Sequence, residues 1–390
     1  MSERNSDRKG KATVRVALGR RSYWIRIWPK LLDGGADARF GLSSAKRLGI
    51  VTDENVEPLY ADRFCRAFAS GSTEIELFVL PAGERSKSAE MLGVLWDGFL
   101  AGRLGRDSAV VALGGGVVGD LAGFAAATYM RGIRFFQVPT TLLAMVDSSV
   151  GGKTAIDLAG GKNSVGAFHQ PSGVLIDPET LSTLSEREYR AGLGEVVKYA
   201  VSLDRTFFDF LEANTDAIAR REESILTELI AHCCRMKGAI VRADEKETNG
   251  VRALLNYGHT FAHAYETAAG FEGLLHGEAV ALGLMDAVRL AARLARTDRR
   301  FEKIDSAQIR RQEKLLRRLG LAQRLSQIVP VRKNSARWRP EALLDAMRRD
   351  KKNADGRLRL VLPTDLGKSN LFDSIPEKPI LDILARQIGR

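Results

Sequence analysis

Histidine is scarce in this chain, and three of its five histidines lie between positions 259 and 276. His259 and His263 are one helical turn apart, so they would share one face of a helix. His276 follows at the start of the next apolar stretch. A catalytic zinc ion commonly has three protein ligands and keeps one position for water or substrate. The clustering predicts a metal site and calls for a carboxylate beside the imidazoles.

Glu195 is the candidate for that carboxylate. It lies among apolar neighbours in Gly194–Lys198, on a predicted helix. The alternative is a surface ion pair with Lys198, worth about 0.2–0.5 kcal/mol. The histidine pair lacks the glutamate that follows the first histidine in metalloproteases, so that motif is excluded. His169 and His232 are expected to be ordinary histidines.

A glycine-rich segment, Gly114–Asp120, has the GxGxxG spacing, follows an apolar run and leads into a predicted helix. Glycines let the backbone approach a pyrophosphate, and a helix N-terminus supplies free amides. A dinucleotide site or a tight structural turn would both explain it. The acid usually found about 20 residues later is not evident. Asp53 and Asn55, after an earlier strand, would hold a ribose or cap a helix.

Two lysines lie on glycine-rich backbone, Lys153 after Gly151 and Gly152, and Lys162 before Asn163. Lysine is a flexible point charge, and glycine allows a ligand to come close, so the pattern suits phosphate or hydroxyl groups. Solvated lysines are the alternative. Lys153 with Thr154 looks like the end of a P-loop, but the first glycine of that motif is absent, which argues against ATP hydrolysis.

The elements that must position these residues change in type along the chain. A β-hairpin is predicted over residues 14–27, and apolar runs that alternate with helical stretches then predict a parallel sheet covered on both faces. These runs are at 48–52, 75–80, 109–113, 135–138 and 174–176. Long amphipathic stretches at 188–200, 222–244 and 278–295 predict helices. We therefore expect a disordered tail over 1–12, an α/β nucleotide-binding domain over 13–184 and a helical metal-binding domain over 185–390.

The composition fits an ordinary globular protein of two-domain size, with 390 residues, 45% hydrophobic and 27% charged. No apolar run approaches the roughly 20 residues that span a bilayer, so no membrane association is expected. Cys65, Cys233 and Cys234 have no spacing suited to a zinc site or disulfide framework, and a cytoplasmic location is expected. The formal charge of +11 comes without a nucleic-acid-binding signature. It favours a solvated basic face or small anionic ligands over nucleic acid.

From about Val14 to about Lys368 the chain resembles 3-dehydroquinate synthase, of the sugar phosphate cyclase superfamily. The motifs that carry the resemblance are Gly114–Asp120, Asp147–Lys153, Gly161–Gly166, Gly194–Lys198, Asp244–Glu247, Leu255–His263 and His276–Glu278. The resemblance implies an α/β N-terminal Rossmann-like nucleotide-binding domain and an all-α C-terminal metal-binding domain. It implies a homodimer that uses NAD and zinc, or cobalt. The implied activity is that of a phosphorus–oxygen lyase of the shikimate pathway of aromatic amino acid biosynthesis, which converts 3-deoxy-D-arabino-heptulosonate 7-phosphate to 3-dehydroquinate and phosphate.

The same resemblance implies roles for individual residues. The metal ligands would be Glu195, His259 and His276. The NAD contacts would be Asp53, Asn55, Glu84, Lys87, Gly115, Gly116, Val117, Asp120, Thr140, Thr141, Lys153, Lys162, Thr180 and Thr183. Lys237 and Arg252 would hold the substrate carboxylate. The phosphate would be surrounded by Lys153, Asn163, Asn256 and His263, closed over by Lys351 or Lys352, and reached by Arg131 of the neighbouring subunit. Further polar contacts would come from Asp147, Lys162, Lys198 and Glu247.

Two departures from the family pattern lie in predicted loops, where length changes are tolerated. The chain is one residue longer between Glu247 and Arg252, which bears on the role of Glu247. Ala155-Ile156-Asp157 replaces the more usual Gly-Val-Asn.

Three other functions are compatible with parts of this pattern. A sibling sugar phosphate cyclase would act on a substrate without a carboxylate, so it would not need both Lys237 and Arg252. A metal-dependent alcohol dehydrogenase would release NADH. A non-enzymatic binding protein would not need the complete set Glu195, His259 and His276.

Overall fold

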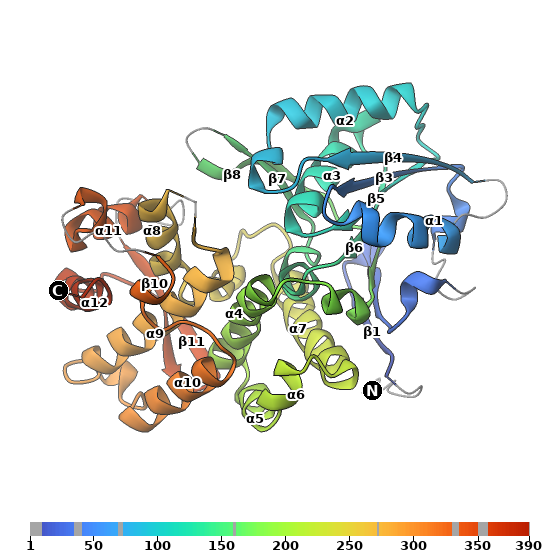
Figure 1. Ribbon diagram of the computed structural model, residues 1–390. Helices are drawn as coiled ribbons and strands as arrows, with labels where there is room; N and C mark the ends of the chain where they lie inside the picture. The colour runs from blue at the N-terminus through green and yellow to red at the C-terminus, as the bar shows by residue number, and fades with distance from the viewer. Residues whose placement is uncertain are drawn as a thin grey trace. The chain divides into compact units, whose positions relative to one another are not determined.

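The computed structural model describes residues 10–34, 41–68, 73–158, 161–270, 273–329, 335–349 and 358–389. The chain forms two compact units, each built from two segments (Figure 1). Unit 1 comprises Met1–Ser185 and Arg221–Lys246, and unit 2 comprises Glu186–Arg220 and Glu247–Arg390. Positions 1–9 of the predicted tail lie outside the described residues, and the first strand begins at Ala12.

Unit 1 is organised around a seven-stranded sheet with the order β1-β2-β9-β6-β5-β3-β4. The strands are β1 (Ala12–Val16), β2 (Tyr23–Ile27), β3 (Arg47–Asp53), β4 (Glu74–Leu80), β5 (Ala109–Gly114), β6 (Arg134–Pro139) and β9 (Gly173–Ile176). β1 pairs antiparallel with β2, and every other neighbouring pair is parallel. The predicted hairpin and parallel sheet are both confirmed.

Both faces of the sheet are covered, as the continuous apolar run of β5 predicts. Val111 faces a core that includes side chains of α1 (Asp62–Phe68). Its neighbour Val110 faces the opposite core, with α2 (Ala89–Ala101) and α3 (Gly116–Thr128). A second hairpin, β7 (Lys153–Leu158) with β8 (Gly161–Phe168), packs on α3. This arrangement places the glycine-rich segment at the end of a central strand.

The helix α7 (Glu223–Ala243) belongs to unit 1, although it follows residue 185 in the sequence. It packs on β1 and β2. The hairpin has an alternating pattern, so Val14, Val16 and Ile25 form an apolar face that is fully or almost fully buried. An amphipathic helix can cover such a face. The expected division at residue 185 therefore differs from the observed units in this element.

Unit 2 is mainly helical, as expected. Its helices are α4 (Glu186–Leu203), α5 (Arg205–Ala213), α6 (Thr215–Ala219), α8 (His259–Ala269), α9 (His276–Leu294), α10 (Ser306–Arg318), α11 (Pro340–Arg348) and α12 (Glu377–Gln387). It is not purely helical, because β10 (Arg359–Asp365) and β11 (Lys368–Asp373) form an antiparallel hairpin. Leu360, Val361 and Leu362 are all buried along β10, and a short continuous apolar run of this kind is consistent with a buried strand, which the expectation of an all-α domain overlooked.

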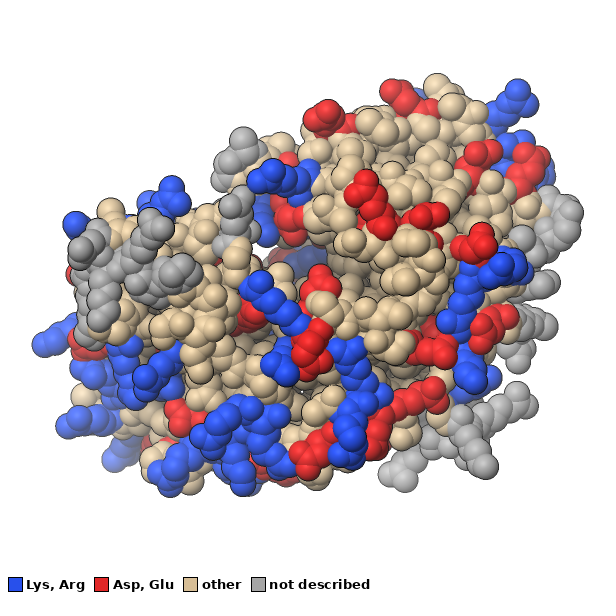
Figure 2. All heavy atoms as spheres, viewed as in Figure 1, with Lys and Arg blue, Asp and Glu red and all other residues tan. Residues whose placement is uncertain are grey.

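Basic side chains gather around α10 on the face shown in Figure 2. Several of them are paired with acids. Arg311 binds Asp209 and Glu212, and Arg318 binds Asp216 at 3.0 Å. Exposed pairs of this kind contribute little to stability, but they reduce the net field of the surface. Among the described residues, no helix has the length and apolar character needed to cross a membrane.

Candidate functional site

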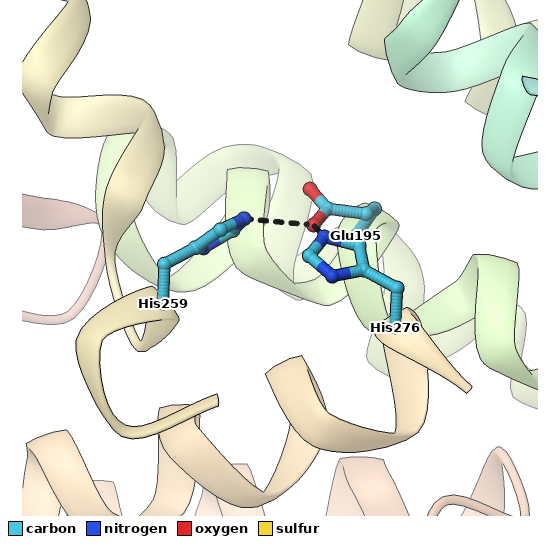
Figure 3. A group of neighbouring side chains, drawn as sticks. All are labelled: Glu195, His259 and His276. Atoms are coloured by element: carbon cyan, nitrogen blue, oxygen red, sulfur yellow. Dashed lines mark ion pairs between the residues drawn. The ribbon is translucent and has the colours of Figure 1, made fainter. Parts of the chain in front are cut away.

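The three predicted metal ligands come together inside unit 2 (Figure 3). Glu195 lies on α4, His259 begins α8 and His276 begins α9. Their ligand atoms all lie within 4.8 Å of one another. Both histidines direct Nε2 at Glu195 Oε1, His259 at 3.4 Å and His276 at 3.5 Å.

Glycines allow the three helices to approach closely enough for this arrangement. A Cβ on Gly277 would lie 1.7 Å from the carbonyl oxygen of Ala191, and one on Gly194 would lie 2.3 Å from the carbonyl oxygen of Gly277. The start of α9 therefore touches the backbone of α4 directly, beside both Glu195 and His276. A Cβ on Gly283 would similarly lie 2.1 Å from the carbonyl oxygen of Gly258, just before α8. Side chains at these positions would push the ligands apart.

The donor set fits a zinc ion. Zinc bonds of about 2.0–2.2 Å in a tetrahedral site place ligand atoms about 3.4 Å apart. The two measured nitrogen–oxygen distances agree with that separation. Glu195 is fully buried, and its carboxylate contacts the Lys198 ammonium as well as both imidazoles. A buried carboxylate needs opposite charge, and Lys198 supplies part of it, which keeps Glu195 ionised and able to bind a cation held between it and the two imidazoles.

The other nitrogen of each imidazole also has a partner. Nδ1 of His259 lies 3.2 Å from the carbonyl oxygen of Tyr257, and Nδ1 of His276 lies 3.1 Å from Glu266 Oε1. Such contacts fix the tautomer that leaves Nε2 free for a metal. Sequence reasoning did not identify Glu266. The signal available was its position two helical turns after His259, on the same face of α8.

The electrostatics of this group are dominated by Glu195. Burial favours its neutral form, but Lys198 and then His259 outweigh burial and hold the pKa of Glu195 well below its usual range. Lys198 contacts Glu195 directly, and both side chains are buried, so the alternative of a surface ion pair is excluded. Burial lowers the pKa of His259 to about 4, whereas for His276 burial is outweighed by the contacts with Glu195 and Glu266, which raise its pKa to about 10. His259 is therefore neutral at pH 7, and His276 would release a proton on binding a metal.

The start of α9 is held by a further set of contacts. The guanidinium of Arg187 donates to both oxygens of Glu278, at 2.7 and 2.8 Å, and to the carbonyl oxygen of Gly273. Glu278 in turn accepts the amide of Leu275 at 2.9 Å. These contacts fix the backbone on both sides of His276.

Other predicted substrate residues of unit 2 lie near these elements in sequence. Arg252 and Asn256 are on the 3-10 helix Val251–Asn256, where Arg252 is only 1% exposed. His263 is one turn beyond His259, and their ring centroids are 5.6 Å apart. Glu247 lies in an exposed segment with a φ of 58°. Lys351 and Lys352 lie outside the described residues.

In unit 1 the glycine-rich segment forms the turn from β5 into α3. Gly115 is the N-cap, and no side chain caps the first turn of α3. A Cβ on Gly119 would lie 2.7 Å from Gln137 Oε1 of β6, so this glycine allows close packing of helix on strand. Thr140 Oγ1 is buried and has no hydrogen-bond partner among the described residues. Open amides and an unsatisfied hydroxyl suit a polar ligand such as a nucleotide pyrophosphate.

Five of the residues predicted for unit 1 form one linked group, which we call the Lys87 cluster: Glu84, Lys87, Asp120, Lys162 and Asn163. The Lys87 ammonium binds Asp120 at 2.6 Å and donates to Asn163 Oδ1. Lys162 lies 3.5 Å from Glu84. Burial raises the pKa of Asp120, and the charge of Lys87 opposes that rise. The residue that departs from the family pattern, Asp157, accepts the Asn163 amide at 2.7 Å, so it supports the same group.

Asp53 caps the turn that follows β3. Its Oδ1 accepts the amides of Asn55 at 2.9 Å and Val56 at 3.0 Å. The helix that follows, Glu57–Ala61, has Val56 at its N-cap and no side-chain cap, so the alternative of a helix N-cap at Asp53 or Asn55 is wrong. Tyr60 links to two other predicted residues, because its hydroxyl lies 2.6 Å from Thr183 Oγ1 and 3.2 Å from the Thr180 carbonyl oxygen. Thr141 Oγ1 accepts the amide of Ala144 at 3.2 Å.

The remaining predicted residues of unit 1 lie elsewhere on it. Lys237 on α7 donates to the Asp147 carbonyl oxygen at 2.7 Å and binds its carboxylate at 2.8 Å. Lys153 begins β7 and is exposed. Arg131 is exposed in a turn where its φ is 67° and that of Met130 is 49°. Gly116 and Val117 begin α3.

The sequence matches two family models, described as 3-dehydroquinate synthase N-terminal over residues 77–191 and 3-dehydroquinate synthase C-terminal over residues 192–353. It is 44% identical to a 3-dehydroquinate synthase of Desulforamulus reducens over 377 residues, covering 96% of this chain and 99% of the relative.

Solved structures of related enzymes share the fold of this chain. A 2-epi-5-epi-valiolone synthase from Streptomyces hygroscopicus subsp. jinggangensis, with NAD+ and Zn2+ bound, is 29% identical, with a TM-score of 0.81 over 95% of this chain and 98% of that one. A 2-deoxy-scyllo-inosose synthase complexed with carbaglucose-6-phosphate, NAD+ and Co2+ is 24% identical, with a TM-score of 0.81 over 96% of this chain and 100% of that one, which supports the fold. The two family models, the long match to a curated relative and the shared fold together show that this chain belongs to the 3-dehydroquinate synthase family.

Proposed function

We propose that this protein is a 3-dehydroquinate synthase that converts 3-deoxy-D-arabino-heptulosonate 7-phosphate to 3-dehydroquinate and phosphate. The observation that carries the proposal is the group of Glu195, His259 and His276, whose separations suit a zinc ion. The 44% identity to a 3-dehydroquinate synthase over almost the whole chain supports the choice of reaction.

Zinc, or cobalt, would be held by this group in unit 2. NAD would be held in unit 1 at the turn between β5 and α3, where Gly115, Gly116 and Val117 offer backbone amides. The Lys87 cluster and Thr140, Thr141, Thr180 and Thr183 would supply polar contacts to the cofactor. Asp53 and Asn55 would hold its adenosine ribose, since Asp53 uses only Oδ1 in the cap described above.

The substrate carries a carboxylate and a phosphate, and the chain supplies cations for both. Lys237 and Arg252 would hold the carboxylate, for which a guanidinium offers paired donors. Lys153, Asn163, Asn256 and His263 would surround the phosphate, with Lys351 closing over it. Asp147, Lys162, Lys198 and Glu247 would make the remaining polar contacts.

The reaction is redox-neutral overall. Bound NAD would supply a hydride acceptor, and bound zinc would supply Lewis acidity at the substrate alcohol. In the proposed reaction one secondary alcohol of the substrate would be oxidised, phosphate would leave by β-elimination with its own oxygen taking the proton, and the same carbon would then be reduced. Ring opening and an intramolecular aldol reaction would close the carbocycle. The chain's residues chiefly position the substrate and balance its charges, which is where most of the catalysis would arise.

Lys198 has a defined part in this scheme. Its ammonium contacts Glu195 and is almost completely buried, so it stabilises the ionised carboxylate that a metal ligand must be. A cation fixed there would also stabilise negative charge that develops on a substrate oxygen bound beside this carboxylate.

We further propose that the protein acts as a cytoplasmic homodimer in which Arg131 of one subunit reaches the phosphate of the other. The backbone of the exposed turn around Arg131 supports an intermolecular role. Positive φ values at Met130 and Arg131 are unfavourable for residues with side chains, and a turn that only faces solvent does not need them. Sedimentation at assay concentration tests this, since a monomer with full activity would contradict it.

The deciding experiment is incubation of the purified protein with the heptulosonate phosphate and NAD, followed by identification of the product. Phosphate should accumulate far beyond the amount of NAD, and substrate deuterated at the oxidised carbon should retain its label. NADH formed in step with turnover, or label lost to solvent, would show a dehydrogenase instead.

The alternative of a sibling cyclase is tested by Arg252→Ala. If the substrate carries a carboxylate, this change should raise KM by about 10- to 100-fold, since charged hydrogen bonds are worth about 1.5–3 kcal/mol. Zinc and NAD binding should be retained. An unchanged KM for the carboxylate substrate would favour a sibling activity.

A further inference from the structure

Glu266 is buried on α8 and contacts a residue that lies on another helix. Its side chain is 7% exposed, and Oε1 lies 3.1 Å from Nδ1 of His276 at the start of α9. The opposite nitrogen of that imidazole, Nε2, faces Glu195 Oε1 at 3.5 Å. Glu266 therefore lies behind the ring, on the side away from the position that a metal would occupy.

The two histidine ligands are not held equally. The His259 side chain is 10% exposed, and its Nδ1 contacts the nearby Tyr257 carbonyl oxygen. The His276 side chain is 35% exposed, so surrounding atoms restrict its rotation less. Since χ2 of histidine has a broad energy profile, packing alone does not fix the orientation of this ring.

We propose that Glu266 is a positioning residue of the metal centre, which accepts the Nδ1 hydrogen of His276 and fixes this ring in the tautomer and orientation that present Nε2 to zinc. The carboxylate lies on the helix that also supplies His259, two turns further along. One helix thus contributes one ligand and orients a second, so α8 and α9 are coupled through the centre. Outer contacts of this kind typically change metal affinity by about 10- to 100-fold.

The test is the zinc dissociation constant of the full-length protein, measured by competition with a chromophoric chelator. Glu266→Ala should weaken zinc binding by about 10- to 100-fold. Glu266→Gln keeps an acceptor oxygen but loses the charge, so it should weaken binding by about 3- to 10-fold on the same scale. The glutamine variant also serves if the alanine variant fails to fold.

Asp286→Asn is the matched control. Asp286 is a buried carboxylate on α9 that accepts hydrogen bonds from Tyr265 of α8 and from Gln387, so it links the same helices through partners other than histidine. The zinc affinity of the Asp286→Asn variant should stay within about twofold of the wild type, a much smaller change than that expected when a residue that orients a metal ligand is lost. Equal weakening in both positions would show a general packing effect and overturn the proposal, as would wild-type affinity in Glu266→Gln.

This inference rests on the proposed metal site, and the measurement separates the two. A wild-type protein that binds no zinc or cobalt would overturn the metal site and with it the role of Glu266. A wild-type protein that binds zinc, together with Glu266 variants that bind it equally well, would overturn the role of Glu266 alone.

Discussion

The two units position their chemical groups by different means. In unit 1, the Lys87 cluster lies on a loop, a helix and a hairpin, and its members are joined by ion pairs and hydrogen bonds between side chains. In unit 2, the metal ligands lie on three helices whose backbones touch at Gly194, Gly277, Gly258 and Gly283. Charge holds the first group together, and close backbone packing holds the second.

This difference determines which substitutions each group tolerates. A backbone contact cannot adjust to an added methyl group, because the atoms that it would strike belong to helices packed on both sides. A network of side chains can adjust to small changes in volume, but the loss of one charge leaves its partner buried without compensation. The metal group of unit 2 should therefore be sensitive to an increase in side-chain size, and the Lys87 cluster of unit 1 to a loss of charge.

Gly277→Ala should have the largest effect. The added Cβ would lie 1.7 Å from the carbonyl oxygen of Ala191, so α4 and α9 must separate. We expect a loss of more than about 3 kcal/mol in the free energy of unfolding, since overpacking of a rigid contact can exceed the usual cost. Zinc binding and activity should be lost with it. Chemical denaturation and metal analysis measure both.

Gly93→Ala is the matched control for that change. Gly93 lies inside α2 of unit 1, and a Cβ there would meet no atom within 4 Å. This substitution should stabilise the protein by about 0.5–1 kcal/mol, because alanine loses less conformational entropy in a helix. If both glycines respond alike, backbone packing is not what sets unit 2 apart.

His276→Ala should abolish activity while preserving the fold. It removes a metal ligand without adding volume, so zinc content should fall to background and the circular dichroism spectrum should be unchanged. The comparison with Gly277→Ala is direct because the two residues are adjacent. A variant with wild-type zinc content and turnover would remove the metal-site hypothesis.

Lys87→Met should weaken NAD binding by about tenfold or more and destabilise unit 1 by about 2 kcal/mol. The cost falls below that of a fully buried pair, because the Asp120 side chain is 17% exposed. Zinc affinity should be unchanged. The control is Lys46→Met, since Lys46 pairs with Asp107 on the surface and should have no measurable effect. Calorimetry with NAD and with zinc separates the two ligands.

Asp286→Asn should leave zinc binding almost unchanged, and its effect on stability should depend on pH. Burial raises the pKa of Asp286 to about 6 from its ordinary value of 3.8. A carboxyl whose pKa is raised by folding contributes stability below its unfolded pKa and loses that contribution as pH rises through the folded pKa. Relative to the asparagine variant, the wild type should lose about 2–3 kcal/mol between pH 4 and pH 7. Urea denaturation at several pH values measures this, and a constant difference would contradict it.

The sequence allowed the sheet and the metal ligands to be predicted because both leave local patterns. Apolar runs marked the parallel strands. The spacing of the histidines placed His259 and His263 on one face of a helix and His276 at the start of the next helix. Glu195, which is distant in sequence, was a candidate because a carboxylate was needed beside the imidazoles, and the resemblance then favoured that role over a surface ion pair. The structure brings the three side chains together, and their role as metal ligands stays a prediction.

Other features depend on contacts between distant segments and could not be predicted in this way. Gly194 and Gly277 look like ordinary helical glycines until α4 and α9 are seen to touch. The helix α7 packs on the apolar face of the hairpin β1–β2. The sequence shows that this face needs to be covered, but it does not show which helix covers it. The face of α8 on which Glu266 lies could be predicted. Its contact with His276 could not, because the sequence does not show how the chain turns between α8 and α9.

The interleaved composition of the units has a consequence for the order of events during synthesis. Unit 1 lacks α7 until residue 243 has been made, so the apolar face of its first hairpin has no cover when the rest of its sheet is complete. By then the ribosome has already produced α4, which carries Glu195, but α8 and α9, which carry the two histidines, have not yet been made. At about 5–20 residues per second, this interval lasts several seconds. Nascent chains arrested before α7 should therefore bind chaperones that recognise exposed apolar strands, and chains arrested after it should not.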